Sequence, residues 1–115
     1  MSKYISKYFT QDEMQCSCEA CGHSCPIDSI FLKNLDKLRE ESGGPLYVDS
    51  GFRCNSYNEK IGGVKSSWHT KGRASDIVPK TISLEDLKIL ADKYFEEVIP
   101  YKEKGFLHVG NPYEL

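Results

Sequence analysis

An aspartate within an apolar strand strongly constrains how this chain can fold. Residues 74–78 (ASDIV) have the composition of a central β-strand, which Pro79 is expected to end. A buried carboxylate is costly without a compensating partner, and a bound metal ion would be one. His69 precedes Asp76 by seven residues, with Gly72 between them. A loop of this length can turn and continue as a strand, so that both side chains face one point.

A histidine far along the chain can complete a metal site with these two side chains. His108 lies in residues 105–109 (GFLHV), where strand alternation places Phe106 on the same face as His108. Imidazole nitrogens and carboxylate oxygens are good zinc ligands, and three protein ligands leave a fourth position open for water in catalytic sites. The sequence therefore predicts a zinc site formed by His69, Asp76 and His108.

These residues belong to a longer pattern that resembles the M15 zinc peptidases. The family signature Ser-x-His-x-x-Gly-x-Ala-x-Asp is matched by residues 67–76. Residues 50–53 (SGFR) resemble the family's Ser-Gly-aromatic-Arg segment, and residues 107–109 (LHV) resemble the segment that supplies its last zinc ligand. The resemblance implies one M15-like peptidase domain over residues 1–115. It would be an α+β fold of the hedgehog/DD-peptidase type, with a small antiparallel sheet carrying a zinc cleft and helices flanking the sheet.

The resemblance also implies a function. The family includes D-alanyl-D-alanine carboxypeptidases and peptidoglycan endopeptidases, so we expect zinc-dependent hydrolysis of a peptidoglycan stem-peptide bond. By the same resemblance, Arg53 binds the substrate carboxylate or stabilises the developing oxyanion, and Ser67 binds substrate. A guanidinium suits the Arg53 role because it donates two parallel hydrogen bonds to oxygen atoms. The alternative is a non-catalytic, zinc-containing cell-wall-binding module derived from such a peptidase.

The general base is not where the family pattern would place it. Many members carry an acidic residue three positions before the last zinc histidine, others a histidine two before it, and some an acidic residue two after it. These positions are Gly105, Phe106 and Gly110 here. Hydrolysis needs a group that accepts a proton from water. Glu103 is the first candidate for this catalytic role, and Glu97 is the second. The missing acidic residue is also the feature that favours the binding-module alternative.

A cysteine-rich loop occupies the end of the lead-in, residues 1–25. Four cysteines and a histidine lie within ten residues, and a fifth cysteine follows later in the chain: Cys16, Cys18, Cys21, His23, Cys25 and Cys54. Cys18 and Cys21 form a C-x-x-C pair that Cys16, Cys25, His23 or Cys54 can complete as a structural zinc site. Disulfides and free thiols are the alternatives. If the loop holds a second, structural zinc ion, its predicted ligands are Cys16, Cys18, Cys21 and Cys25.

Hydrophobic periodicity predicts the remaining elements. Helices are expected over residues 26–42, over residues 54–61 with Asn55 or Ser56 as cap, and from Ser83 through Tyr94. Strands are expected at residues 46–50, and at 97–101 and 105–109 as a hairpin. Thr10 and Glu13 match a capping box, a loop is expected over residues 64–68, and the aromatic residues Tyr4, Tyr8 and Phe9 are expected to pack in the core.

Length and charge narrow the class of protein. The chain has 115 residues, a net charge of -2 and a pI near 5.9, which argue against a broad nucleic-acid interface. No apolar run approaches the roughly 18 residues of a membrane span. Residues 1–9 lack the apolar core of a signal peptide. The resemblance implies action on peptidoglycan. Together with it, these features predict a monomer that is either cytoplasmic until lysis or phage-associated, as in a phage endolysin.

Overall fold

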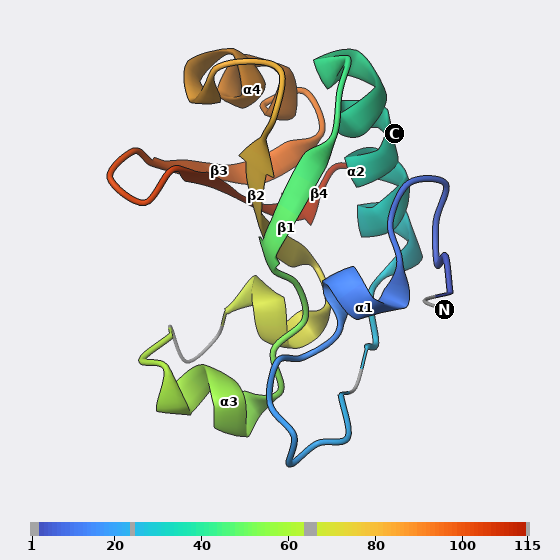
Figure 1. Cartoon of the computed structure of the whole chain (residues 1–115), viewed down its shortest axis with the longest axis vertical. Coiled ribbons are helices and arrows are strands. Elements are labelled where there is room, and N and C mark those ends of the chain that lie inside the picture. The colour runs from blue at the N-terminus through green and yellow to red at the C-terminus, as the bar shows by residue number, and fades with distance from the viewer. Residues whose placement is uncertain (1–2, 24, 64–66, 115) are drawn as a thin grey trace.

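The chain folds as an α+β protein with a small antiparallel sheet, as predicted (Figure 1). The computed structural model describes residues 3–23, 25–63 and 67–114. Within these residues the helices are α1 (Gln11–Met14), α2 (Ser29–Ser42), α3 (Asn55–Lys60), the 3-10 helix η1 (Trp68–Lys71) and α4 (Leu84–Ala91). The strands are β1 (Leu46–Ser50), β2 (Ala74–Pro79), β3 (Phe95–Tyr101) and β4 (Phe106–Pro112).

The four strands pair in the order β1-β2-β4-β3, and every pairing is antiparallel. The central pair is β2 with β4, which are joined through α4 and β3 in the chain. Their register places Asp76 directly opposite His108, and Ser50 of β1 lies opposite Asp76 on its other side. Residues that face each other across antiparallel strands project to the same side of the sheet. The register therefore brings the predicted strand ligands together.

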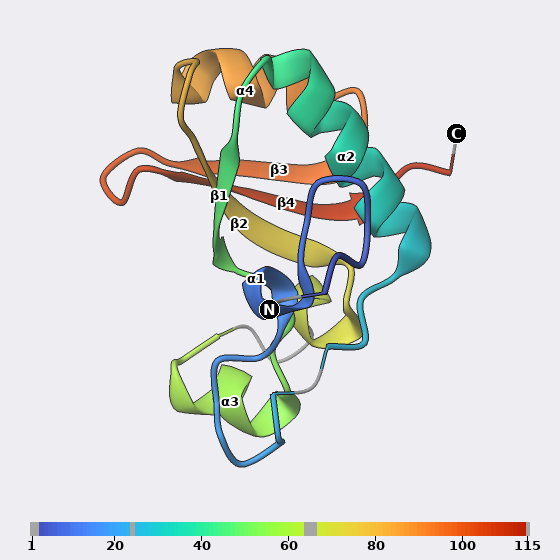
Figure 2. The ribbon, with the colours of Figure 1, turned by 45° about the vertical axis from the view of Figure 1, so that its right-hand side comes forward.

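One face of the sheet packs on the hydrophobic core. Ile77, Leu107 and Val109 are fully buried there, and the buried Phe31 of α2 packs its ring 5.4 Å from that of Phe95. Figure 2 shows α2 and α4 above the sheet, with η1 and α3 on the opposite side. Because side chains alternate along each strand, the residues between the core positions project toward η1. The sheet thus has a core face and a site face.

Helix boundaries differ from the predicted ones where capping groups decide them. The helix predicted from residue 26 begins at Ser29, because the Asp28 side chain accepts a hydrogen bond from the Phe31 amide. Helix α3 is capped by Cys54, whose sulfur accepts from the Tyr57 amide, and neither Asn55 nor Ser56 takes that role. Helix α4 follows Ser83 as predicted but ends at Ala91, so Tyr94 packs against the core from the following turn.

The N-terminal segment is held by the predicted capping box. The Thr10 side chain accepts from the Glu13 amide, and the Glu13 carboxylate accepts from the Thr10 amide. Phe9 is buried in the core, whereas Tyr4 is 65% exposed, so the expectation that all three aromatic residues pack inside was wrong for Tyr4. Of the predicted 64–68 loop, residues 64–66 lie outside the described residues. The prediction was wrong for Trp68, which begins η1 after the Ser67 cap. Among the described residues, no helix has the length and apolarity needed to cross a bilayer.

Candidate metal centre

The three predicted metal ligands converge on one point of the site face. His69 Nε2 lies 3.3 Å from Asp76 Oδ1, and His108 Nδ1 lies 3.0 Å from the same oxygen. One donor atom from each residue lies within 4.8 Å of the others. All three residues are buried, and the His69 side chain is only 1% exposed. The fold therefore gathers two imidazole nitrogens and one carboxylate oxygen from η1, β2 and β4.

This donor set fits a zinc ion. Zinc bonds to nitrogen and oxygen are about 2.0–2.2 Å long, which places neighbouring donors of a tetrahedral site roughly 3.3 Å apart. The separations of 3.0 and 3.3 Å are close to that value. Two histidines and one carboxylate are also a donor combination of catalytic zinc sites, in which the fourth position stays open. His69, Asp76 and His108 are the residues that would hold the ion.

A backbone carbonyl fixes the orientation of His69. The His69 Nδ1 donates to the Gly51 carbonyl oxygen over 2.8 Å, which holds the ring with Nε2 facing Asp76. Gly51 lies directly against α1, since a Cβ at this position would come within 2.5 Å of the Met14 carbonyl oxygen. The Phe52 amide donates to that same oxygen over 2.8 Å. The glycine of the SGFR segment thus allows α1 to hold the carbonyl that orients a metal ligand.

Gly72 ends η1 and returns the chain toward β2. Its φ of +70° lies in the left-handed region, and a Cβ there would come within 2.0 Å of the Pro26 carbonyl oxygen. The Gly72 carbonyl accepts from the Asp28 amide over 2.9 Å. Both its conformation and its close packing therefore favour glycine. This glycine sets the direction of the chain between His69 and Asp76.

Asp76 is a buried carboxylate surrounded by cationic and hydrogen-bonding groups. Arg53 donates from Nη2 to Asp76 Oδ2 over 3.2 Å, which leaves Oδ1 to the two histidines. Burial by itself would raise the pKa of Asp76. The hydrogen bonds from His108 and His69 outweigh it and lower this pKa to about 2. Asp76 is consequently ionised at neutral pH, as a metal ligand must be.

His108 has a carboxylate on each of its ring nitrogens. Nδ1 faces Asp76, and Nε2 is hydrogen-bonded to Glu97 Oε1 from the neighbouring strand β3. Burial alone would lower the pKa of His108, but the hydrogen bonds to Asp76 and Glu97 raise it above the usual 6.5. A carboxylate on the distal nitrogen of a metal-binding histidine holds the ring in place.

Comparison with known families finds one family model that matches most of the chain. The family model of Peptidase M15 matches residues 7–110, which include β1, β2, β3, most of β4 and all three candidate ligands. The chain belongs to the M15 peptidase family. Membership indicates a peptidase, and M15 peptidases are in general zinc-dependent. No curated protein was found to match the chain.

A cleft opens above the candidate ligands of this M15 peptidase. Its volume is about 480 Å³, which falls within the usual range of small-molecule sites. The lining combines the candidate metal ligands with cationic, aromatic and aliphatic side chains and one further carboxylate: Arg53, Ile61, Ser67, Trp68, His69, Asp76, Glu97, Ile99, Tyr101, Lys104, Phe106 and His108. The cleft can thus take a short peptide with its reacting bond beside the ligands.

Arg53 and Ser67 both line the cleft, and both also hold the site together. Arg53 donates from Nε to Ser50 and from Nη1 to Asn58, in addition to its bond with Asp76. The Ser67 hydroxyl accepts from the His69 amide over 3.2 Å and caps η1. Sequence reasoning assigned substrate contacts to these two residues. The structure adds that each positions a candidate metal ligand.

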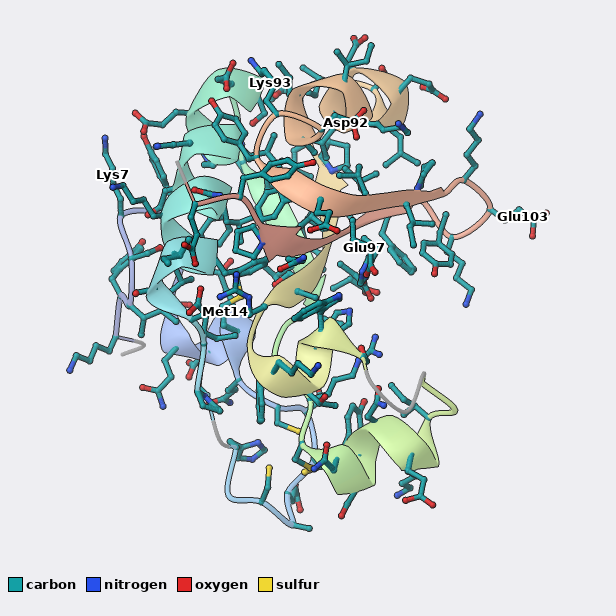
Figure 3. All side chains as sticks on the ribbon, turned by 180° about the vertical axis from the view of Figure 1, so that it is seen from behind. Lys7, Met14, Asp92, Lys93, Glu97 and Glu103 are labelled. Atoms are coloured by element: carbon teal, nitrogen blue, oxygen red, sulfur yellow. The ribbon has the colours of Figure 1, made fainter. Side chains whose placement is uncertain are left out.

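The two glutamates considered as general base occupy different environments. Glu103 lies at the exposed tip of the β3–β4 hairpin and points away from the cleft, whereas Glu97 lies over the site face (Figure 3). Among the described residues that line the cleft, Glu97 and Asp76 are the carboxylates. The structure therefore brings Glu97 to the site and leaves Glu103 outside it.

The register of the hairpin explains why Glu97 reaches the site. Glu97 is paired directly with Gly110, so both project to the site face. Alternation along β4 places Gly110 on the same face as His108. Glu97 can be assigned to that face only when its pairing with Gly110 is known. Without the register, nothing in the sequence favours Glu97 over Glu103.

The cysteines form a second group of potential metal ligands, with one change from the predicted set. Sulfur atoms of Cys16, Cys18, Cys21 and Cys54 lie within 4.8 Å of one another. Cys25 is not part of this group, because its sulfur is directed at the Gln11 carbonyl oxygen, 3.9 Å away. The set Cys16, Cys18, Cys21 and Cys25 is therefore corrected: Cys54 takes the fourth place.

Proposed function

We propose that this M15 peptidase hydrolyses a peptide bond in the stem peptide of peptidoglycan, as a D-alanine-type carboxypeptidase or endopeptidase. The observation that carries the proposal is the convergence of His69 Nε2, Asp76 Oδ1 and His108 Nδ1 at the base of a cleft that also contains Glu97. When bound by these ligands, zinc supplies a Lewis acid that polarises a carbonyl and lowers the pKa of water toward about 7.

Glu97 is the proposed general base. Its Oε1 is engaged by His108 Nε2, and the second carboxylate oxygen offers an acceptor to a water molecule in the cleft. In hydrolysis Glu97 would take a proton from the attacking water and deliver it to the nitrogen of the leaving amine. The hydroxyl remains on the carbonyl carbon, so that the products are a carboxylic acid and an amine.

The pairing of Glu97 with Gly110 supports this assignment. Some M15 members carry an acidic residue two positions after the last zinc histidine, which is Gly110 in this chain. A Cβ at Gly110 would lie 3.3 Å from Glu97 Oε1 and 3.3 Å from His108 Nε2. A carboxylate that these members supply from β4 is therefore supplied here by β3, and glycine at position 110 leaves room for it.

Arg53 and Ser67 are proposed to position the substrate. Hydrogen bonds to described residues use three of the five guanidinium N–H groups of Arg53, and the others can bind a terminal carboxylate or a developing oxyanion. Lys104 adds a second cation to the cleft, while Trp68 and Tyr101 supply apolar walls. This composition suits a short peptide that carries a carboxylate.

One observation favours a second candidate function, a zinc-containing module that binds cell-wall peptide without cleaving it. The hydrogen bond between Glu97 and His108 is the geometry of a carboxylate that orients a metal ligand. If Glu97 has this role alone, the cleft would bind the peptide and no group would activate water.

Glu97→Gln separates the two functions, and Glu103→Gln is its matched control. Zinc-loaded proteins are incubated with purified stem peptides, and products are identified by mass spectrometry. We expect wild type and Glu103→Gln to release the same products, and Glu97→Gln to retain its zinc but lose roughly 10²–10⁴-fold in rate.

Other outcomes would change the conclusion. Peptide binding without cleavage by the zinc-loaded wild type would support the binding module. Full activity in Glu97→Gln together with loss in Glu103→Gln would return the base to the hairpin tip. If neither binding nor cleavage is seen with any stem peptide, the proposed substrate class is wrong.

A further inference from the structure

Four cysteines from two distant segments meet outside the cleft. Cys16, Cys18 and Cys21 lie in the loop after α1, and Cys54 caps α3. Figures 1 and 2 both show this loop beside α3, on the side of the molecule away from α2 and α4. The Cys18 sulfur lies 3.5 Å from that of Cys16, 3.0 Å from that of Cys21 and 3.4 Å from that of Cys54. All four sulfur atoms lie within 4.8 Å of one another.

These separations fit one tetrahedral ion better than disulfides. Zinc–sulfur bonds of about 2.3 Å place the sulfurs of a tetrahedral site roughly 3.8 Å apart, so small outward shifts would admit the ion. A disulfide would need about 2.05 Å. None of the five cysteines, all of which lie in the described ranges, forms one. Cys18 has three sulfur neighbours at similar distances, and a disulfide could use only one of them.

Backbone amides support the sulfur atoms as charged ligands. The Cys54 amide donates to the Cys16 sulfur over 3.4 Å, and the Tyr57 amide donates to the Cys54 sulfur over 3.4 Å. Hydrogen bonds of this kind favour the thiolate, which is the form of cysteine that binds metal. The loop and the start of α3 thus present donors as well as ligands.

We propose that Cys16, Cys18, Cys21 and Cys54 hold a structural zinc ion that fastens the N-terminal loop to the chain entering α3. Four sulfur ligands close the coordination sphere, as in structural zinc sites. This site is separate from the cleft and does not depend on the proposed peptidase activity.

The position of Cys54 gives the ion a defined structural task. Cys54 directly follows Arg53, which binds Asp76, and the same stretch includes Gly51, whose carbonyl orients His69. The N-terminal segment already contacts this stretch through the hydrogen bond from Phe52 to the Met14 carbonyl. An ion at the cysteines would fasten the other side of the stretch. The proposed structural zinc would therefore stabilise residues 51–54, the segment that positions His69 and Asp76 in the cleft.

Metal content per chain provides the first test, with Cys25→Ser as the matched control for Cys18→Ser. Elemental mass spectrometry should find one zinc fewer in Cys18→Ser than in wild type and no loss in Cys25→Ser. His69→Ala should keep the cysteine-bound zinc, so the result does not depend on the cleft. Equal zinc content in Cys18→Ser and wild type, or iron in place of zinc, would overturn the proposal.

Thiol protection tests the same site in the wild type, in case Cys18→Ser does not fold. Cys18, Cys21, Cys54 and Cys25 are all partly buried, so burial alone predicts similar alkylation by iodoacetamide. In zinc-loaded protein we expect only Cys25 to react readily, and a chelator should expose the other three. Equal reaction of all four before chelation would contradict the site, as would a mass that reveals disulfides.

Cobalt provides a spectroscopic check on the ligands. Cobalt-substituted wild type, Cys25→Ser and His69→Ala should each show a thiolate-to-cobalt charge-transfer band in the near ultraviolet. A wild-type cobalt spectrum without this band would exclude thiolate ligation and overturn the proposal.

Discussion

The cleft and the cysteine group are both clusters of metal-binding side chains, but the chain builds them in opposite ways. Two of the three cleft ligands, Asp76 and His108, are cross-strand neighbours held by the hydrogen bonds of the sheet. The four cysteines come from a loop and a helix cap, where no ladder of hydrogen bonds fixes their spacing. The sheet can therefore preorganise the cleft without metal, whereas in the loop the proposed ion would hold the four sulfur atoms in place.

The ligand types follow the same division. Nitrogen and oxygen donors that leave an open position suit a reacting centre, whereas four sulfurs close the coordination sphere of a structural ion. Removal of a ligand should therefore cost activity at the cleft and order at the loop. If the two clusters are independent, a substitution in one should leave the metal content of the other unchanged.

His69→Ala should give the largest effect and separates the clusters most sharply. We expect it to remove one of two zinc ions per chain. Hydrolysis of a stem peptide should fall roughly a thousandfold or more, because a Lewis acid stabilises the transition state by several kcal/mol. Elemental mass spectrometry and a peptidase assay on the same preparation provide both readouts. His23→Ala is the matched control: its ring contacts the Cys16 carbonyl but belongs to neither ligand group, and both ions should remain. Two ions retained in His69→Ala would break the comparison.

The metal ligands of the cleft can be predicted from sequence where strand periodicity determines the direction of their side chains. Asp76 is a charged residue in an apolar strand, and His108 alternates with the core residues Leu107 and Val109. Such patterns depend on local sequence, and the family resemblance supplied the order of the three ligands. Glu97 was ranked second because its place depends on the pairing of β3 with β4, which is a tertiary property.

The cysteine group shows the opposite limit. The C-x-x-C pair of Cys18 and Cys21 is recognisable, and Cys54 is among the residues that could complete it, but the predicted set takes the nearby Cys25 as the fourth ligand. The chain instead folds back to bring Cys54 across, 36 residues after Cys18. No periodic pattern reports such a contact, because loops lack the repeating geometry that links sequence position to side-chain direction. The helix caps show the same limit, since Cys54 replaced the polar residues expected at the start of α3.

Gly72→Ala should have the next largest effect, this time on stability. A Cβ would meet the Pro26 carbonyl oxygen at 2.0 Å, and the positive φ adds strain of its own. We expect a loss of roughly 2–5 kcal/mol in the free energy of unfolding, measured by chemical denaturation at fixed zinc concentration. Because Gly72 lies between His69 and Asp76, the affinity of the cleft for zinc should fall, while the cysteine site should keep its ion.

Gly105→Ala is the matched control for this change. Gly105 has a similar φ of +77°, but apart from its chain neighbours no atom of the described residues lies within 4 Å of the site of its Cβ. Its cost should be limited to the backbone term, about 1–2 kcal/mol, and zinc content should not change. Equal destabilisation by the two substitutions would show that the contact with Pro26 contributes nothing.

The smallest expected effect is on the titration of His108. It tests whether carboxylates on the neighbouring strands set the pKa of this cleft ligand. In metal-free protein its pKa is raised above 6.5 by hydrogen bonds to Asp76 and Glu97, despite burial. Protonated His108 therefore stabilises the fold, fully below pH 6.5 and less as pH rises through the raised pKa. Glu97→Gln removes one of the two carboxylates and should lower this pKa, whereas Glu103→Gln should leave it unchanged. NMR titration of the His108 ring measures the pKa in both variants.

Since protons compete with zinc for the ring, Glu97→Gln should also let the cleft retain zinc to lower pH. An unchanged His108 pKa in Glu97→Gln would mean that Glu97 does not act on this ligand.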